Sequence, residues 1–242
     1  MRNAVVLASI AVGLCFAATS ASALEGSDNS FAIYGLGAFV NGDLTFGEFD
    51  TEVDVNAADV LGSLEAALFA RYRHQNEGWA FVFDGQYAAL GDSNQEGFVE
   101  TDLDMDLYLF QLDGAYRFND TTEAFLGVRY VRFESEVDVH FLGDGSLHRE
   151  GDASFWDPVV GVRTLRPMSD RWWLQAQFDI GGGDMDLTWQ AMAHAGYLMG
   201  EDLSLWFGYR GIGMDFDDGG GRNRIDADIV MHGPEVGVAF HF

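Results

Sequence analysis

The chain ends in a segment, residues 235–242, in which apolar side chains alternate with small or polar ones. The apolar positions are Val236, Val238, Phe240 and Phe242. A period of two is that of a β-strand, here with one face suited to hydrocarbon. Two structures fit such a segment. It is either an ordinary C-terminal core strand of a soluble protein, or the last strand of a closed barrel, which pairs with the first.

The first 23 residues predict a secretory signal peptide. A short basic start at Arg2 precedes an apolar run over residues 4–18, and Ala21-Ser22-Ala23 has the small residues of a cleavage site. The only cysteine, Cys15, lies within this segment. The predicted mature chain, 24–242, therefore has no disulfide or thiol chemistry, and its length suits one all-β domain.

The charge and the hydropathy of the chain exclude several classes of protein. There are 39 acidic residues against 13 basic ones, all of them Arg, and the net charge is −26. Nucleic acid is a poor partner for such a surface. Hydrophobic residues make up 48% of the chain, so it is not an acidic disordered tail. Beyond the signal peptide, no run of 18 apolar residues is present to form a membrane-spanning helix.

Alternation along the mature chain predicts ten strands. Their ranges are 31–45, 62–73, 79–91, 103–118, 124–138, 154–166, 172–182, 187–199, 203–216 and 226–242. Each is at least as long as a tilted membrane strand. Eight strands is the alternative count, if two of the ten belong to loop hairpins.

The connections alternate in length. Those after the second, fourth, sixth and eighth strands are short, whereas those at 47–61, 92–102, 139–153 and 217–225 are longer and polar. Only the connection at 183–186 departs from this pattern. Short turns at one end and long loops at the other are typical of an outer-membrane barrel, whose chain ends lie on the periplasmic side. We expect one helical turn within residues 56–64.

Aromatic residues cluster near the ends of the predicted strands. We expect a periplasmic belt of Tyr72, Trp79, Tyr116, Trp172, Tyr197 and Phe242, and a second belt of Tyr87, Tyr108, Tyr130, Trp156 and Trp189. Two such belts separated by aliphatic residues match the interfacial girdles of a membrane barrel. The predicted fold is therefore a transmembrane antiparallel up-and-down β-barrel, with a soluble barrel as the alternative.

Polar residues on the opposite face of these strands should lie inside the barrel. The predicted interior network consists of Asp84, Gln86, Asp113, Arg117, Arg129, Asp157, Arg163, Gln175, Gln177, Asp179 and Arg210. Charges in so narrow a lumen must pair, and Arg suits this because its fork bonds carboxylates in pairs. The network is either a structural core or the lining of a narrow pore or substrate slot. His194 is the one inward histidine away from the terminus, and no catalytic set is predicted.

Acidic residues also cluster, at Asp102, Asp104 and Asp106, at Asp184 and Asp186, at Asp215, Asp217 and Asp218, and at Asp226 and Asp228. Such groups of oxygens could hold Ca²⁺ or Mg²⁺. None of these clusters has the glycine and distal glutamate of a helix–loop–helix calcium site, so we interpret them as solvated loops and predict no metal or cofactor. Divalent ions that bridge this rim to neighbouring lipid phosphates are a further hypothesis.

Several motifs resemble a family of Gram-negative outer-membrane β-barrel proteins. They are residues 156–163 (WDPVVGVR), 179–182 (DIGG), 196–197 (GY) and 208–210 (GYR), together with 59–64 (DVLGSL), Trp79 and Asp84. The resemblance covers nearly the whole mature chain. It departs at Gly183, where members often carry Phe, and in the absence of Lys. The resemblance implies a fold and a location in the outer membrane, and it implies no established reaction.

We therefore expect a monomeric, non-enzymatic outer-membrane barrel with a structural or surface-interaction role, or a narrow-pore activity. The alternative is a membrane-embedded hydrolase or acyltransferase that acts on lipid A or peptides at the rim. Expected partners are outer-membrane lipid and lipopolysaccharide, the barrel assembly machinery and periplasmic chaperones. The apolar residues Val238, Phe240 and Phe242 resemble the signal that the assembly machinery reads.

Overall fold

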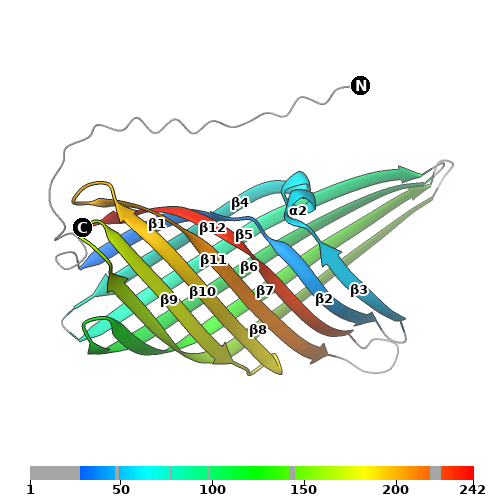
Figure 1. Ribbon diagram of the computed structural model, residues 1–242. Helices are drawn as coiled ribbons and strands as arrows, with labels where there is room; N and C mark the ends of the chain where they lie inside the picture. The colour runs from blue at the N-terminus through cyan, green and yellow to red at the C-terminus, as the bar shows by residue number, and fades with distance from the viewer. Residues whose placement is uncertain (1–27, 47–48, 77, 97–98, 142–144, 219–224) are drawn as a thin grey trace.

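The computed structural model describes residues 28–46, 49–76, 78–96, 99–141, 145–218 and 225–242, and shows one sheet wound into a barrel (Figure 1). The predicted signal peptide lies outside these residues. Ten antiparallel strands form the ring: β1 (Asn29–Leu36), β4 (Leu64–Gln75), β5 (Trp79–Glu96), β6 (Val99–Asn119), β7 (Thr122–Phe141), β8 (Gly145–Pro167), β9 (Trp172–Gly181), β10 (Leu187–Leu198), β11 (Leu203–Asp218) and β12 (Ile225–His241). The predicted ten-stranded barrel is confirmed, and the eight-stranded count is wrong.

The barrel closes where the last strand pairs with the first. Phe240 on β12 lies opposite Phe31 on β1, as the terminal alternation predicted. The predicted first strand is in fact two strands, β1 and β2 (Phe39–Phe46), and both pair with β12. The break between them lies at Gly37, whose N–H donates to the Pro234 carbonyl over 2.9 Å. Because Pro234 has no N–H to return, the ladder is interrupted at this point.

Two of the predicted long loops, at 92–102 and 139–153, are largely strand, so that part of the prediction was wrong. β5 and β6 continue to residues 96 and 99, and β7 and β8 continue to residues 141 and 145. β6 alone has 21 residues, or about 70 Å at ~3.4 Å per residue. The alternation of apolar and charged residues in these segments continues beyond the length that a bilayer requires, and pairing continues with it. The tips of these hairpins, at 97–98 and 142–144, lie outside the described residues.

The first predicted loop contains a strand and a helix. β3 (Phe49–Val55) pairs only with β2 and lies outside the ring, and α2 (Ala57–Ser63) follows it. Asn56 caps the helix, because its side chain accepts hydrogen bonds from the N–H groups of Ala58 and Asp59. The predicted helical turn is confirmed. Among the described residues, no helix is long and apolar enough to cross a membrane.

The outer wall is apolar between two aromatic belts. In the periplasmic belt, Trp79 packs against Tyr116, with ring centroids 5.1 Å apart. In the upper belt, Tyr130 packs against Trp156 at 4.5 Å. Phe81 and Leu126, which are 55% and 68% exposed, lie on the wall between the belts. Side chains of this size are exposed to lipid rather than water in such a wall.

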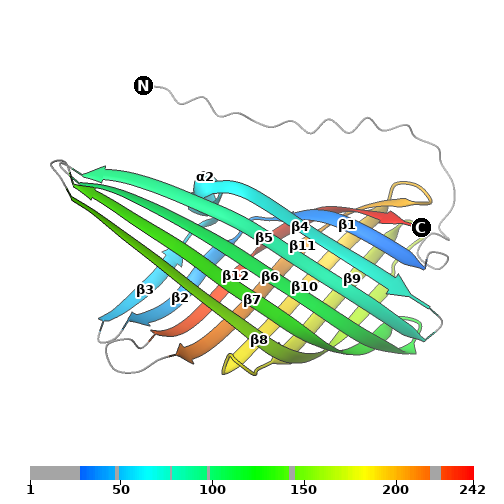
Figure 2. The same cartoon turned by 180° about the vertical axis from the view of Figure 1, so that it is seen from behind.

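The two ends of the described chain lie at the same end of the barrel. The start of β1 and the C-terminus are close together, beside the short turns, and Figure 2 shows the same arrangement from behind. At the opposite end, β5 to β8 extend beyond the other strands. In outer-membrane barrels the end with short turns is periplasmic, so the long hairpins are extracellular.

Candidate functional site

The candidate site is the barrel interior, where a network of charged side chains crosses the lumen. Arg210 on β11 lies between two carboxylates. Its Nη2 is 3.1 Å from Asp84 Oδ2, and its Nε is 2.7 Å from Glu235 Oε1. Asp84 also accepts hydrogen bonds from Arg71 Nε, at 2.9 Å, and from the Tyr34 hydroxyl. Because Asp84 is on β5, these contacts join strands that are far apart in the ring.

A second part of the network centres on Arg129 of β7, which has no exposed surface. Its guanidinium contacts Asp179 on β9, donates to Gln111 Oε1 over 2.7 Å, and donates to Thr188 Oγ1 on β10 over 2.7 Å. Asp179 accepts a further hydrogen bond from Gln177, at 2.9 Å. Each charged group therefore has several partners, as the low dielectric of a barrel interior requires.

A third part lies nearer the periplasmic end. Arg163 on β8 contacts Glu123 Oε1 at 2.7 Å and Asp113 Oδ2 at 2.8 Å. Arg73 approaches the same Glu123 with both terminal nitrogens, each at 2.7 Å from a carboxylate oxygen. This is the bidentate geometry in which Arg binds carboxylate most tightly.

The three parts together balance their charges. Five guanidiniums, from Arg71, Arg73, Arg129, Arg163 and Arg210, pair with five carboxylates, from Asp84, Asp113, Glu123, Asp179 and Glu235. His194 adds a contact to Glu235, with 2.5 Å between His194 Nε2 and Glu235 Oε2. The network thus crosses the lumen with a set of ion pairs whose formal charge is zero.

The structure places all eleven predicted interior residues on the inner face. Nine are buried, whereas Arg117 and Gln175 line a cavity below the network. Asp157 is fully buried and accepts a hydrogen bond from the Met185 N–H at 2.9 Å rather than from an Arg. The predicted assembly residues Phe240 and Phe242 point outward, 48% and 65% exposed.

The members that sequence reasoning left out of the predicted network include Arg71, Arg73, Glu123, Glu235 and Tyr34. Arg71 and Arg73 flank the outward Tyr72, so the period of the strand predicts that both face inward. Glu123 is the second residue of β7, and the prediction placed it in the preceding turn. Tyr34 is buried at 7% exposure, although tyrosine is typical of the lipid belts as well. The strand boundary concealed Glu123 and the residue type concealed Tyr34, whereas alternation places Arg71, Arg73 and Glu235 on the inner face.

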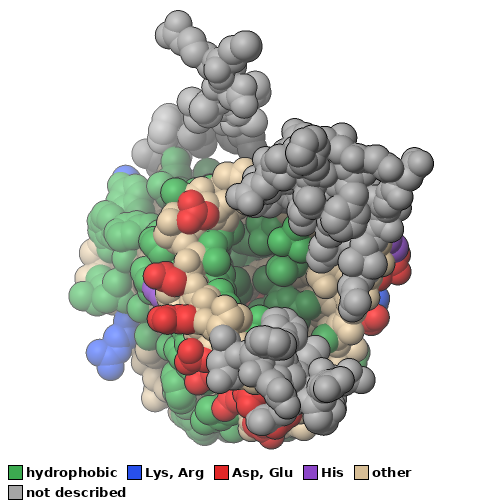
Figure 3. Space-filling view, turned by 90° about the vertical axis from the view of Figure 1, so that its right-hand side faces the viewer, with side chains coloured by type: hydrophobic (Ala, Val, Ile, Leu, Met, Phe, Trp, Pro, Cys, Tyr) green, Lys and Arg blue, Asp and Glu red, His purple; other side chains and the backbone are tan. Residues whose placement is uncertain are grey.

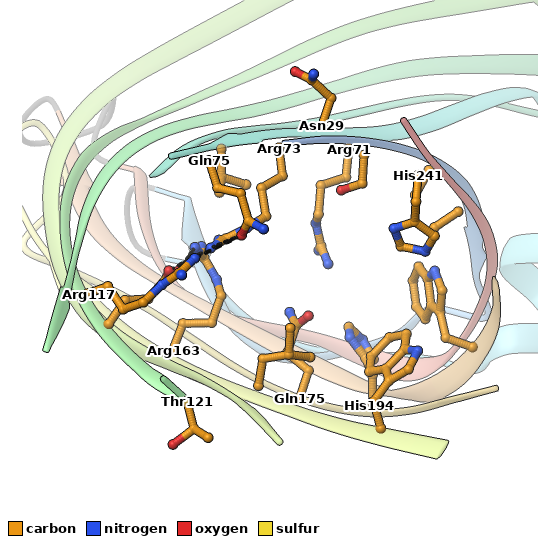
Figure 4. Close-up of a pocket in the computed structure, with 18 of the residues that line it drawn as sticks. Asn29, Arg71, Arg73, Gln75, Arg117, Thr121, Arg163, Gln175, His194 and His241 are labelled. Atoms are coloured by element: carbon orange, nitrogen blue, oxygen red, sulfur yellow. Dashed lines mark hydrogen bonds and ion pairs between the residues drawn. The ribbon is translucent and has the colours of Figure 1, made fainter. Parts of the chain in front are cut away.

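The cavity below the network opens at the periplasmic end and has a volume of about 340 Å³. At this end it is lined by Asn29, by the turn residue Thr121 and by Thr122, the first residue of β7. Figure 4 shows Arg73, Arg117 and Arg163 pointing toward one another across it, opposite His194 and His241.

Above the network the interior is apolar. Leu109, Val131, Phe155, Ile212 and Met214 form the centre of a buried cluster at this level. Figure 3, which looks into the extracellular end, shows a hollow with apolar side chains inside and acidic side chains around its rim. From the periplasm outward, the interior therefore consists of a cavity with arginines, a charge network and an apolar layer.

The outer surface beyond the upper belt carries a different arrangement, which we call the acidic face. Three outward positions on each of β6, β7 and β8 lie directly opposite one another. The nine residues are Asp102, Asp104 and Asp106 on β6, Glu134, Glu136 and Asp138 on β7, and His148, Glu150 and Asp152 on β8. In the part of the chain that the structure describes, the ion pairs of this face come from Arg132, on Glu134, and from His148.

His148 stands at one corner of the acidic face. Its Nε2 is 2.9 Å from Glu150 Oε1, and its Nδ1 is 2.9 Å from Asp138 Oδ1. These hydrogen bonds, that to Glu150 first, raise the pKa of His148 to about 9. Ligand atoms of Glu136, Asp138 and His148 lie within 4.8 Å of one another, a spacing that could hold a metal ion. Of the residues in this group, only Asp138 is partly buried.

One pair of residues has the composition of a catalytic site. Ser204 Oγ and His241 Nε2 are 2.9 Å apart near the periplasmic end. Ser204, however, has no exposed surface, so a substrate carbonyl could not reach its hydroxyl in this arrangement.

Comparisons with known proteins bear on the fold alone. No protein-family model matches the chain, and no curated protein matches its sequence. Among solved structures, the outer membrane protease OmpT from Escherichia coli is 11% identical, with a TM-score of 0.58 over 90% of this chain and 98% of that one. The translocator domain of the autotransporter NalP from Neisseria meningitidis is 14% identical, with a TM-score of 0.54 over 90% of this chain and 89% of that one. The closed ring, its aromatic belts and this shared fold make the chain an integral β-barrel protein of the bacterial outer membrane.

Proposed function

We propose that the chain is a non-enzymatic surface protein of the outer membrane, which binds surrounding lipopolysaccharide head groups through divalent cations on its acidic face. The position of this face supports the proposal. Tyr108 and Arg132 lie opposite each other on β6 and β7, at the upper limit of the hydrocarbon. Asp106 and Glu134 are the next outward pair toward the extracellular end. Outward side chains at that height face sideways, into the layer of lipid head groups. The phosphates of the head groups and the carboxylates of the acidic face both offer the oxygen ligands that Ca²⁺ and Mg²⁺ prefer.

The internal energetics of the face favour a bound cation. Asp104 lies directly opposite Glu136, which lies directly opposite Glu150 on the next strand. Like charges at directly opposite positions destabilise a sheet. A divalent cation between two such carboxylates removes the repulsion and leaves charge to attract a phosphate. Glu136 and Asp138 provide one such pair, with ligand oxygens within 4.8 Å of each other.

The test compares two double variants of the full mature protein in detergent. Asp104→Asn with Glu136→Gln neutralises the centre of the acidic face. Asp170→Asn with Glu201→Gln removes two exposed carboxylates at the periplasmic turns and is the matched control. We expect Ca²⁺ binding by equilibrium dialysis, and retention of lipopolysaccharide without EDTA, to fall in the first variant only. Equal Ca²⁺ binding by both variants and the wild type would overturn the proposal.

A narrow pore receives less support from the geometry. Arg210, Asp84 and Glu235 occupy the middle of the lumen, and the apolar layer around Ile212 lies above them. An ion would have to cross both layers, and the second offers no polar ligand among its buried members. We therefore propose that the barrel does not conduct.

The hydrolase alternative has one observation in its favour, the contact between Ser204 and His241. Labelling with a fluorophosphonate, which reacts with activated serine, tests it directly. We expect no label on Ser204, because the hydroxyl is fully buried. Labelling that disappears in a Ser204→Ala variant would establish the enzymatic alternative instead.

A further inference from the structure

The cavity at the periplasmic end has one cationic wall. Arg73 from β4, Arg117 from β6 and Arg163 from β8 all line it. Glu123 bonds Arg73 and Arg163. Arg117 instead donates to an amide oxygen, Gln75 Oε1, over 3.0 Å, and no ion pair of Arg117 occurs among the described residues. The two other carboxylates of the lining, Asp28 and Asp120, are exposed to solvent at the mouth.

The opposite wall is aromatic. Trp173 on β9 and Trp206 on β11 line it, with 6% and 3% of their surface exposed. Each indole lies over a glycine of the neighbouring strand. A Cβ at Gly196 would come within 2.0 Å of the Trp173 ring, and one at Gly237 within 2.4 Å of the Trp206 ring. Because these two glycines have no side chain, the indoles have room to pack inside the barrel.

The cavity wall also contains an unused hydrogen-bond donor. Trp173 Nε1 is buried and, in the part of the chain that the structure describes, has no hydrogen-bond partner. Buried donors in proteins almost always have an acceptor, and an exception calls for an explanation. The atom has less than 1 Å² of accessible surface and packs over Gly196, so it does not face the cavity space.

From these two walls we infer that the cavity binds a small organic anion, a carboxylate attached to a planar apolar body, which enters from the periplasm. The guanidinium of Arg117 donates to the carboxylate, and the planar body lies against the opposite, aromatic wall. Guanidinium forks match carboxylates, and a volume of about 340 Å³ holds a ring-sized molecule. The charge network closes the inner end, so the ligand is held rather than transported.

The probe is benzoate, titrated by calorimetry into the folded full chain in detergent, with the shift of heat-modifiable gel migration as the check on folding. Inorganic phosphate offers charge without a ring, and benzyl alcohol offers a ring without charge. We expect saturable binding of benzoate, with binding of the two other compounds weaker by about tenfold or more. Benzyl alcohol or phosphate binding as tightly as benzoate would contradict the inference.

Variants locate the site. Arg117→Gln should weaken benzoate binding by about tenfold, the size of one charged hydrogen bond. Arg166→Gln, an outward and exposed position on β8, is the matched control and should bind as the wild type does. No benzoate binding by the wild type, or equal binding by all the folded variants, would overturn the inference.

Discussion

The barrel interior and the acidic face contain similar carboxylates in opposite settings. Inside, five of the six buried carboxylates contact at least one guanidinium, and the sixth, Asp157, accepts the Met185 N–H. On the acidic face, eight carboxylates share one Arg and one His in the described part of the chain. A buried charge has neither water nor ions to neutralise it, so the fold must supply its partner. A surface charge can be neutralised by ions from the surroundings, so the acidic face does not need a partner for each carboxylate from the fold.

The comparison is tested most strongly by removing a shared interior cation. Arg210→Met leaves Asp84 and Glu235 buried with less compensation, and we expect a loss of about 3–5 kcal/mol in the free energy of unfolding. Urea unfolding of the barrel in lipid vesicles measures it. Arg166→Met, at an exposed position, should change stability by less than about 0.5 kcal/mol. A loss below about 1 kcal/mol for Arg210→Met would show that the interior does not depend on pairing.

A smaller loss is expected where the fold offers replacement partners. In Glu123→Gln, Arg163 retains Asp113 at 2.8 Å and Gln177 at 2.7 Å. We therefore expect a destabilisation of about 1–3 kcal/mol in the same unfolding assay. A loss as large as that of Arg210→Met would contradict the account of shared pairing.

Neutralising charges on the acidic face should raise the free energy of unfolding, whereas the interior substitutions lower it. Asp104→Asn with Glu136→Gln removes two like charges that lie directly opposite each other, so we expect a gain of about 0.2–1 kcal/mol at low salt. Screening at high ionic strength should remove most of this gain. If the double variant is less stable than the wild type in the absence of divalent cations, the carboxylates of the acidic face already have stabilising partners within the protein.

The smallest expected effect concerns His148. Glu150→Gln removes the first of the hydrogen bonds that raise the pKa of His148 to about 9, so NMR titration should show a lower pKa in the variant. A raised pKa means that the protonated imidazole stabilises the β7–β8 hairpin below pH ~6.5, and that this contribution is lost as pH rises through about 9. An unchanged pKa in Glu150→Gln would place the cause elsewhere.

The sequence was sufficient to predict the barrel because a wall between lipid and lumen imposes a period of two on every strand. Trp79, Tyr116 and Trp156 lie in the predicted belts for this reason. The extents of the hairpins were harder to predict. The predicted strand 103–118 contains Asp104 and Asp106, whereas Asp102 and the polar residues before it were assigned to a loop, although their spacing continues that of β6.

The pairing inside the barrel could not be predicted from spacing. Alternation places Asp84 and Arg210 on the inner face, but it contains nothing about which strands lie across the lumen from each other. That depends on the stagger of ten strands and on the break at Gly37, which no local pattern reveals. The cavity walls, with Trp173 over Gly196, depend on the same long-range register.

The central claim is that neutral ion pairs close the lumen, so single-channel recording in planar bilayers tests it most directly. The account predicts that the folded wild-type barrel inserts without discrete conductance steps, because Arg210, Asp84 and Glu235 occupy the lumen below an apolar layer. Reproducible, ohmic steps from the wild-type protein would contradict it.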